Sequence, residues 1–210
     1  VMGGGLGLMA GASHRVVTEK SRIAMPEITI GLFPDVGGSW FLNRMPGRVG
    51  LYLGLTGAHL NASDALFVKL ADFYVEHAEK AALLDDLLGV DWDDNYRHNH
   101  HKLSALLRQH RGRYPLPESP VRAHLDFINA ITDFDSVDDI AAALAFHQND
   151  DAWIQRGAKA LQAGSPTSAK VIFETFRRAT HMSLEEVFAM ELGLAIQFCR
   201  HPDFREGVRA

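Results

Sequence analysis

Apolar residues follow two different patterns along the chain, and a polar stretch separates them. Up to about residue 80, short apolar runs alternate with glycine, proline and polar turns, which is typical of short strands and helices in an α/β core. From residue 121 onward, apolar residues recur at helical spacing. We therefore predict three parts: an α/β core part at 1–80, a polar helical insertion and linker at 81–120, and a mainly α-helical C-terminal region at 121–210.

The first part contains candidates for several short elements. Helices are predicted from Leu6 to near Gly11-Ala12 and at 38–42, 49–55 and 61–70, and short strands at 15–18, 22–24 and 73–75. The strands at 15–18 and 22–24 are joined by a polar turn, which indicates a small hairpin. Ser63 is a candidate N-cap of the helix at 61–70, and Leu6, Leu8 and Met9 are expected to be buried.

The polar part and the C-terminal region are predicted to be mostly helical. Helices are predicted at 80–88, 121–132, 136–147, 153–162, from Ser165 onward, and from Ser183 towards Cys199. Ser183 and Glu186 match a capping box. Apolar residues recur at helical spacing through the last of these helices, so that face, with Cys199 on it, is expected to be buried.

Composition and charge narrow the class of protein. Of the 210 residues, 47% are hydrophobic and 22% are charged, as in an ordinary globular protein. A net charge of -5 argues against a nucleic-acid binder, which would carry a basic excess. No apolar run approaches the length of a membrane span, and a single cysteine fits a reducing compartment. We expect a cytoplasmic protein without nucleic-acid or membrane partners.

Two acids stand in an otherwise apolar stretch at 23–42. Glu27 follows Pro26, and Asp35 follows Pro34. A buried acid is costly unless it is paired or used, so both are candidate catalytic groups. From residue types alone, an equally good interpretation makes Glu27 a solvated turn residue and Asp35 a helix N-cap.

A glycine triplet, Gly3-Gly4-Gly5, precedes the two acids by about twenty residues. Glycine lets the backbone approach a ligand closely, and free N–H groups can stabilise a developing oxyanion. A tight turn with close helix packing is the alternative for the triplet. Its occurrence together with Glu27 and Asp35 favours catalysis.

Other motifs fit less well. The spacing of Gly5, Gly7 and Gly11 is a loose relative of the dinucleotide fingerprint, but it lacks the preceding strand and the long following helix. Ser39 fails the G-x-S-x-G elbow because Phe41 replaces the last glycine, and a buried Cys199 would not favour a thiolate. The histidines at 98, 100 and 101 suggest zinc, but without thiolates or an HExxH helix a solvated face is favoured.

The glycine triplet followed by Met25-Pro26-Glu27 and Pro34-Asp35-Val36-Gly37-Gly38 closely resembles the enoyl-CoA hydratase/isomerase (crotonase) superfamily, and within it the 3-hydroxyisobutyryl-CoA hydrolases. Segments 165–170, 184–187, 190–191 and 203–209 resemble the C-terminal helices of the same hydrolases. The resemblance covers nearly the whole chain. It implies an α/β fold, the C-terminal part of a crotonase-like core, followed by a mainly α-helical region.

The resemblance also implies roles for individual residues. A backbone N–H at Gly4, in the substrate-binding loop with Gly3 and Gly5, would form half of an oxyanion hole for the thioester. Hydratases carry a second glutamate where this chain has Gly7. Glu27 would attack the thioester or activate water, and Asp35 would orient water or shuttle a proton. No metal or redox cofactor is implied, and CoA enters as part of the substrate.

The activity expected on this basis is hydrolysis of 3-hydroxyisobutyryl-CoA, a step in valine breakdown. An enoyl-CoA hydratase or isomerase is one alternative, and a non-catalytic acyl-CoA-binding or assembly module is another. The chain begins at the glycine loop, so we expect a C-terminal fragment that lacks the N-terminal half of the site. Such a fragment should be folded but inactive alone, and should self-associate through its N-terminal portion.

Overall fold

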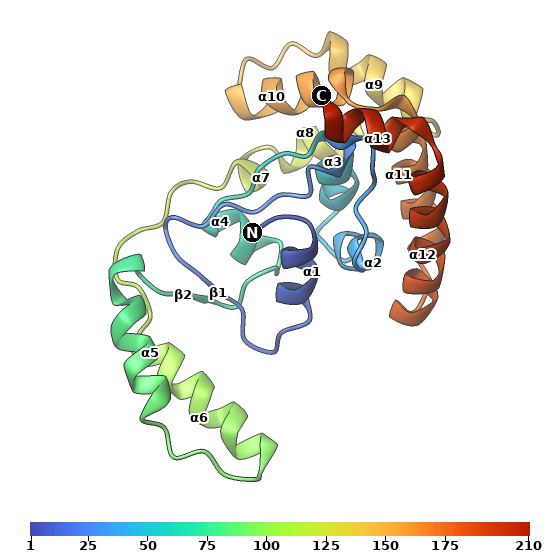
Figure 1. Cartoon of the computed structure of the whole chain (residues 1–210). Helices are drawn as coiled ribbons and strands as arrows, with labels where there is room; N and C mark the ends of the chain where they lie inside the picture. The colour runs from blue at the N-terminus through green and yellow to red at the C-terminus, as the bar shows by residue number, and fades with distance from the viewer.

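A computed structural model describes all 210 residues, and helices dominate it. The elements in chain order are α1 (Gly4–Ala10), β1 (Val16–Val17), the 3-10 helix η1 (Glu27–Ile30), α2 (Gly38–Leu42), α3 (Val49–Thr56), α4 (Ala62–Phe67), β2 (Phe73–Tyr74), the 3-10 helix η2 (His77–Glu79), α5 (Lys80–Leu88), α6 (Tyr96–Gln109), α7 (Pro120–Ala123), α8 (Leu125–Ile131), α9 (Val137–Phe146), α10 (Ala152–Ala163), α11 (Pro166–Ala179), α12 (Leu184–Arg200) and α13 (Pro202–Arg209). Figure 1 shows their arrangement.

The hydrophobic core is built around α3. All eight residues of this helix are buried, as expected for a helix that is apolar on every side. The helices α10 and α11 both contact α3, and they lie around it in Figure 1. One cluster of 34 buried residues runs from Leu6 to Phe198, so the two ends of the chain share a single core.

The sheet is small, and it differs from the predicted hairpin. β1 pairs in parallel with β2, with Val16 opposite Phe73. The second predicted strand instead forms isolated bridges, from Ala24 to Met2 and from Ile23 to Leu60. The hairpin prediction is therefore wrong. A hairpin of two or three residues per strand has too few hydrogen bonds to form by itself, so each segment pairs with a partner distant in sequence.

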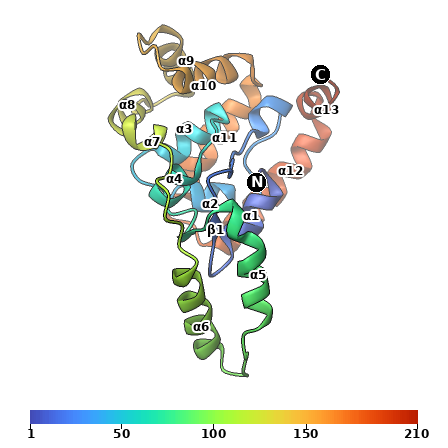
Figure 2. The same ribbon diagram turned by 90° about the vertical axis from the view of Figure 1, so that its left-hand side faces the viewer.

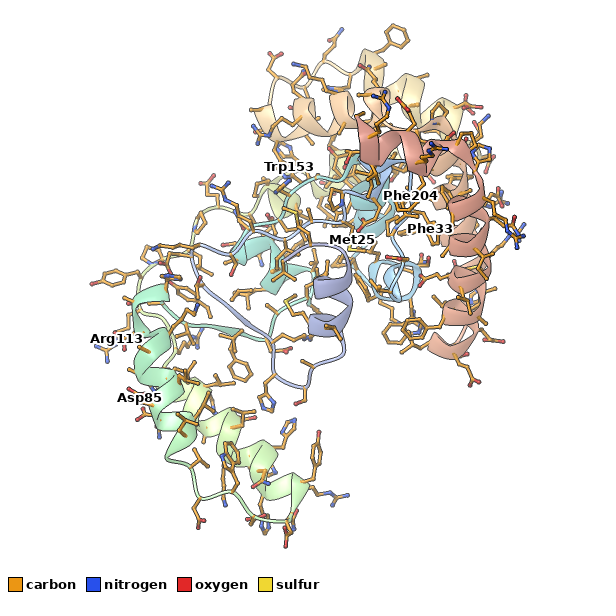
Figure 3. All side chains as sticks on the ribbon, viewed as in Figure 1. Met25, Phe33, Asp85, Arg113, Trp153 and Phe204 are labelled. Atoms are coloured by element: carbon orange, nitrogen blue, oxygen red, sulfur yellow. The ribbon has the colours of Figure 1, made fainter.

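The helices α5 and α6 form an arm that extends from the rest of the molecule in both views (Figures 1 and 2). Val75, Leu83 and Leu107 make a small core of their own in this arm. A hydrogen bond of 2.7 Å between His14 Nε2 and Ser104 Oγ ties α6 to the loop after α1. In Figure 3, Asp85 and Arg113 lie on the arm, far from Met25 and Phe33 in the main body.

Two further predictions about helices need correction. The helix predicted at 121–132 is divided into α7 and α8 at His124, whose φ and ψ of -109° and 16° are not helical. The N-cap of α4 is Asn61 and not Ser63, because the Asn61 side chain accepts the Asp64 N–H while the Ser63 hydroxyl donates to the Pro117 carbonyl. Asp64 completes a capping box with Asn61.

The long helix α12 starts at the predicted capping box of Ser183 and Glu186 but buries a different face from the one expected. Its buried residues are Val187, Glu191 and Phe198. The predicted apolar face is largely exposed, with Phe188 at 48%, Leu192 at 64% and Ile196 at 45%, and Cys199 is exposed as well. Phe198 packs on Phe33 with ring centroids 5.2 Å apart. The buried face of α12 thus includes the Glu191 carboxylate, whose hydrogen-bond donors come from the segment after Asp35.

Candidate active site

The first candidate acid, Glu27, begins η1 and is nearly enclosed. It is only 5% exposed, and its Oε2 atom has no hydrogen-bond partner in the protein. Its Oε1 atom faces Gly3, where an added β-carbon would lie 3.0 Å from that oxygen. The interpretation of Glu27 as a solvated turn residue is therefore wrong. A buried, unpartnered carboxyl oxygen is unusual and is a candidate for chemistry.

The environment of Glu27 changes its acidity. Burial, helped by the nearby negative charge of Asp35, raises the pKa of the Glu27 carboxyl from 4.5 to about 7, although the residue's own backbone N–H acts in the opposite direction. A carboxyl group with a pKa near neutrality can both take up and release a proton under physiological conditions. Such a group suits general acid–base catalysis.

The glycine triplet lies beside Glu27 and presents a free donor. Gly3 precedes α1 with a positive φ of 51° and follows Met2, which forms a parallel bridge with Ala24. The Gly4 N–H has no acceptor in the protein. The Gly5 N–H is already used, since it donates to the Met2 carbonyl at 3.2 Å. The space around the Gly4 α-carbon is open. The loop therefore offers the unpaired Gly4 N–H next to Gly3, which faces the Glu27 carboxyl.

Asp35 lies at the start of a tight turn before α2. The Gly38 N–H donates to the Asp35 carbonyl at 2.8 Å, and both central residues have positive φ, with Val36 at 55° and Gly37 at 82°. Positive φ at both central positions is typical of a type I′ turn, which a β-branched residue such as valine rarely adopts. A strained backbone next to an acid is a feature common at functional sites.

The Asp35 side chain is half-buried, and it is not a helix cap. Gly37 is the N-cap of α2, and no side chain caps that end. Burial raises the pKa of the Asp35 carboxyl above its ordinary value. The interpretation of Asp35 as an N-cap is therefore wrong, and the side chain remains available for another role.

Gly7 brings the glycine loop and the Asp35 turn together. A β-carbon added at Gly7 would lie 2.7 Å from both the Cγ2 atom and the carbonyl oxygen of Val36. The absence of a side chain at Gly7 lets α1 pack directly on the strained turn. Sequence reasoning noted only that Gly7 replaces a glutamate, and missed this packing role because Val36 is distant in sequence.

Glu191 is a third acid near the site; its segment resembles the hydrolases, but sequence reasoning gave it no role at the site. It comes from α12 and is 3% exposed, and its carboxylate accepts the Gly37 N–H at 2.7 Å and the Ser39 N–H at 3.0 Å. Burial, with a further contribution from Asp35, raises the pKa of Glu191. The available sequence signal was a glutamate at helical spacing from Val187, which is buried on the same face.

The other candidates for chemistry lie apart from these acids. The three histidines belong to α6 on the arm, and the structure gathers no group of three or more His, Cys, Asp or Glu side chains that could hold a metal ion. Ser39 is buried and contributes its backbone N–H to Glu191. The structure thus places Glu27 against Gly3, more than twenty residues earlier in the chain, and places Asp35 close enough for its charge to act on Glu27.

Comparison with known proteins settles the family. The sequence model described as enoyl-CoA hydratase/isomerase matches residues 1–210. The chain belongs to the enoyl-CoA hydratase/isomerase family. A carnitinyl-CoA dehydratase from Mycobacterium thermoresistibile has a similar structure, with a TM-score of 0.86, 34% identity, and coverage of 100% of this chain and 57% of that chain. An enoyl-CoA hydratase from Rhodobacter sphaeroides gives a TM-score of 0.73 at 34% identity, with coverage of 90% and 51%. The predicted fold class, part of a crotonase-like core followed by helices, is confirmed.

The curated relatives of this enoyl-CoA hydratase/isomerase family member carry a more specific name. Proteins from Xenopus tropicalis and Homo sapiens, 38% and 36% identical, are both called 3-hydroxyisobutyryl-CoA hydrolase, mitochondrial. The match covers 100% of this chain and 53% of each relative, so the chain spans about half the length of the curated relatives it matches. The resemblance to these hydrolases is confirmed. None of the helices has the length and apolar character that crossing a membrane requires.

Proposed function

We propose that the protein hydrolyses an acyl-CoA thioester, and that 3-hydroxyisobutyryl-CoA, the compound in the names of its curated relatives, is the substrate. The observation that carries this proposal is the enclosed carboxyl of Glu27, with a pKa near 7, beside the glycine loop that carries the unpaired Gly4 N–H. This combination supplies both proton transfer and stabilisation of negative charge, which thioester hydrolysis requires.

The proposed reaction gives each of these groups a role. The thioester oxygen accepts the Gly4 N–H, with Gly3 and Gly5 forming the surrounding loop. Glu27 then takes a proton from a water molecule as the water adds to the carbonyl carbon. Alternatively, the Glu27 carboxylate attacks that carbon itself, and water then hydrolyses the acyl group from Glu27. The C–S bond breaks, the sulfur leaves with a proton, and the free hydroxy acid and CoA are the products. Asp35 orients the water or carries the proton.

Thioester hydrolysis changes no oxidation state, and two carboxyl groups with backbone donors supply the acid–base and electrostatic contributions. The proposal therefore includes no metal or redox cofactor. If the acyl group is 3-hydroxyisobutyryl, the reaction is a step in valine breakdown. A cytoplasmic location stays a prediction from the sequence, while the names of the vertebrate relatives place those proteins in mitochondria.

A second candidate function is the hydration of an enoyl-CoA, because the similar solved structures are a hydratase and a dehydratase. Two observations favour hydrolysis. The position at which the hydratases carry a second glutamate is Gly7, and Val36 lies so close to it that a side chain would require the turn to move. Asp35 supplies the second acid from that turn instead. The third candidate is a non-catalytic acyl-CoA-binding or assembly module.

A pair of assays separates the three candidates. A chain with the full length of the curated relatives is given 3-hydroxyisobutyryl-CoA with a reagent for free thiols, and crotonyl-CoA with detection of the enoyl absorbance. We expect release of free thiol from the first and little hydration of the second. Fast hydration without thiol release would refute hydrolysis in favour of the hydratase, and binding without either reaction would favour the non-catalytic module.

A further inference from the structure

The turn that carries Asp35 is conformationally demanding, and α1 and α12 both pack against it. Val36 and Gly37 both have positive φ, which for Val36 is unfavourable by itself. Val36 packs on Gly7 of α1. From the side of α12, Leu184 and Phe188 lie at ordinary van der Waals distance from the position of an added Gly37 β-carbon. Tertiary contacts must therefore hold this backbone in place.

Glu191 of α12 makes the polar contact that holds this turn. Its two carboxylate oxygens each accept a different backbone N–H, Oε2 that of Gly37 and Oε1 that of Ser39. The first N–H lies within the turn and the second in the first turn of α2, so a single side chain spans the junction between them. Charge-assisted hydrogen bonds of this kind are shorter and stronger than neutral ones.

Burying this carboxylate is unfavourable unless the interactions that it makes are valuable. Glu191 is 3% exposed and forms no salt bridge, so both of its oxygens rely on backbone donors. Asp35 lies close enough for its negative charge to disfavour ionisation of Glu191 further. An apolar residue at this position would avoid both costs, but it would leave the Gly37 and Ser39 N–H groups without acceptors.

We propose that Glu191 is a positioning residue, which holds the Asp35–Gly38 turn through the Gly37 and Ser39 N–H groups and so keeps the Asp35 carboxyl directed at the reaction centre. This inference rests on the proposed hydrolysis. Glu191 acts through Asp35 and does not touch the substrate. Its loss therefore lowers the rate of the chemical step and leaves substrate binding nearly unchanged.

The kinetic test uses Glu191→Gln, which preserves volume but retains only one acceptor oxygen for two donors. In a chain with the full length of the curated relatives, assayed with 3-hydroxyisobutyryl-CoA and thiol detection, we expect kcat to fall about 10- to 100-fold, as small misplacements of a catalytic group do. KM should change less than about threefold, because binding contacts remain. Glu185→Gln is the matched control, since Glu185 is an exposed glutamate on the same helix, and should leave kcat unchanged.

A double-mutant cycle distinguishes positioning of Asp35 from general damage. If Glu191 acts through Asp35, adding Glu191→Gln to Asp35→Asn should lower kcat by less than about twofold further. Unchanged kcat in Glu191→Gln would overturn the inference. So would a full additional loss in the double variant, because Glu191 would then act independently of Asp35.

Amide hydrogen exchange tests the positioning without relying on activity. Glu191→Gln should accelerate exchange in residues 36–39 by about tenfold or more, while exchange in α3 stays unchanged. If the wild-type protein released no CoA, the proposed hydrolysis would fail, and exchange would still decide whether Glu191 holds the turn. Unchanged exchange in residues 36–39 would overturn the inference.

Glu191→Met provides a second variant if Glu191→Gln folds poorly. An apolar side chain of similar volume is often tolerated at the site of a buried charge, while both N–H groups lose their acceptor. A folded Glu191→Met protein with the same loss of kcat and the same faster exchange would support the inference. Unfolding of both variants would make Glu191 a purely structural residue and overturn it.

Discussion

Replacing Glu27 by Gln should make the protein less active and, above neutral pH, more stable. Burial raises the pKa of this carboxyl from 4.5 to about 7, so the folded protein disfavours the ionised form. A carboxyl with a raised folded-state pKa contributes stability at low pH and loses it as the pH rises from the unfolded value through the folded one. The free-energy cost of keeping the ionised Glu27 carboxylate buried in the folded protein is therefore absent below about pH 4 and complete above about pH 8.

The size of the effect follows from the same numbers. A pKa difference of about 2.5 between 4.5 and about 7, at about 1.36 kcal/mol per unit, corresponds to about 3 kcal/mol at pH 8.5. Glutamine has nearly the same shape and no charge to bury. The stability difference between Glu27→Gln and wild type should therefore shift in favour of the variant by up to about 3 kcal/mol between pH 4 and pH 8.5.

Urea unfolding at pH 4, 6, 7 and 8.5 measures this difference. Comparison across pH is informative because effects of the substitution that do not involve ionisation cancel. Glu185→Gln, at an exposed glutamate, is the control and should show no pH-dependent difference from wild type. A Glu27→Gln variant whose relative stability stays constant with pH would refute the buried, high-pKa carboxyl. In the thiol-release assay, the same substitution in a chain with the full length of the relatives should lower kcat roughly a hundredfold or more.

The remaining predictions concern the second acid, the packing of the turn and the length of the chain. Asp35→Asn should impair kcat in the thiol-release assay with less effect on KM, and rates near wild type would contradict a catalytic role. Gly7→Ala should destabilise the protein by about 1–3 kcal/mol in urea unfolding, because its β-carbon would lie 2.7 Å from Val36. Gly11→Ala is its control, since the nearest atom to its β-carbon would be 3.7 Å away, and equal losses in the two variants would contradict the packing argument. The 210-residue chain alone should release CoA at least about a hundredfold more slowly than a chain with the length of the relatives, because one oxyanion donor is worth about that much. The chain alone should also self-associate in light scattering, and comparable rates for both chains, or a strictly monomeric 210-residue chain, would refute this reasoning.

The amino-acid sequence by itself determined the elements whose signals are local. The capping box at Ser183, the proline at the start of α11 and the apolar run of α3 each specify a helix through neighbouring residues, and all three helices formed as predicted. The candidate acids Glu27 and Asp35 came from short motifs within one stretch of the chain, and the family came from these motifs together with the glycine triplet and C-terminal segments. Motifs of this kind can be recognised from the sequence because the residues of each motif are close together in the chain.

Tertiary structure decided every feature that depends on a distant partner. Residues 22–24 pair with Met2 and Leu60 instead of their sequence neighbours, because short strands need partners that the rest of the fold supplies. The face of α12 that is buried could not be read from its apolar spacing. The Gly37 and Ser39 N–H groups provide partners for the Glu191 carboxylate, and this makes burial of a charged face possible while Phe188, Leu192 and Ile196 remain exposed.

The acidity of the candidate site was likewise decided by the fold. The sequence contained a glutamate after a proline, which is compatible with a solvated turn as well as with catalysis. Only the folded chain places that carboxyl against Gly3, away from water and near Asp35, where its pKa rises to about 7. Desolvation and the field of a neighbouring charge depend on distances in space, and residue order alone does not specify those distances.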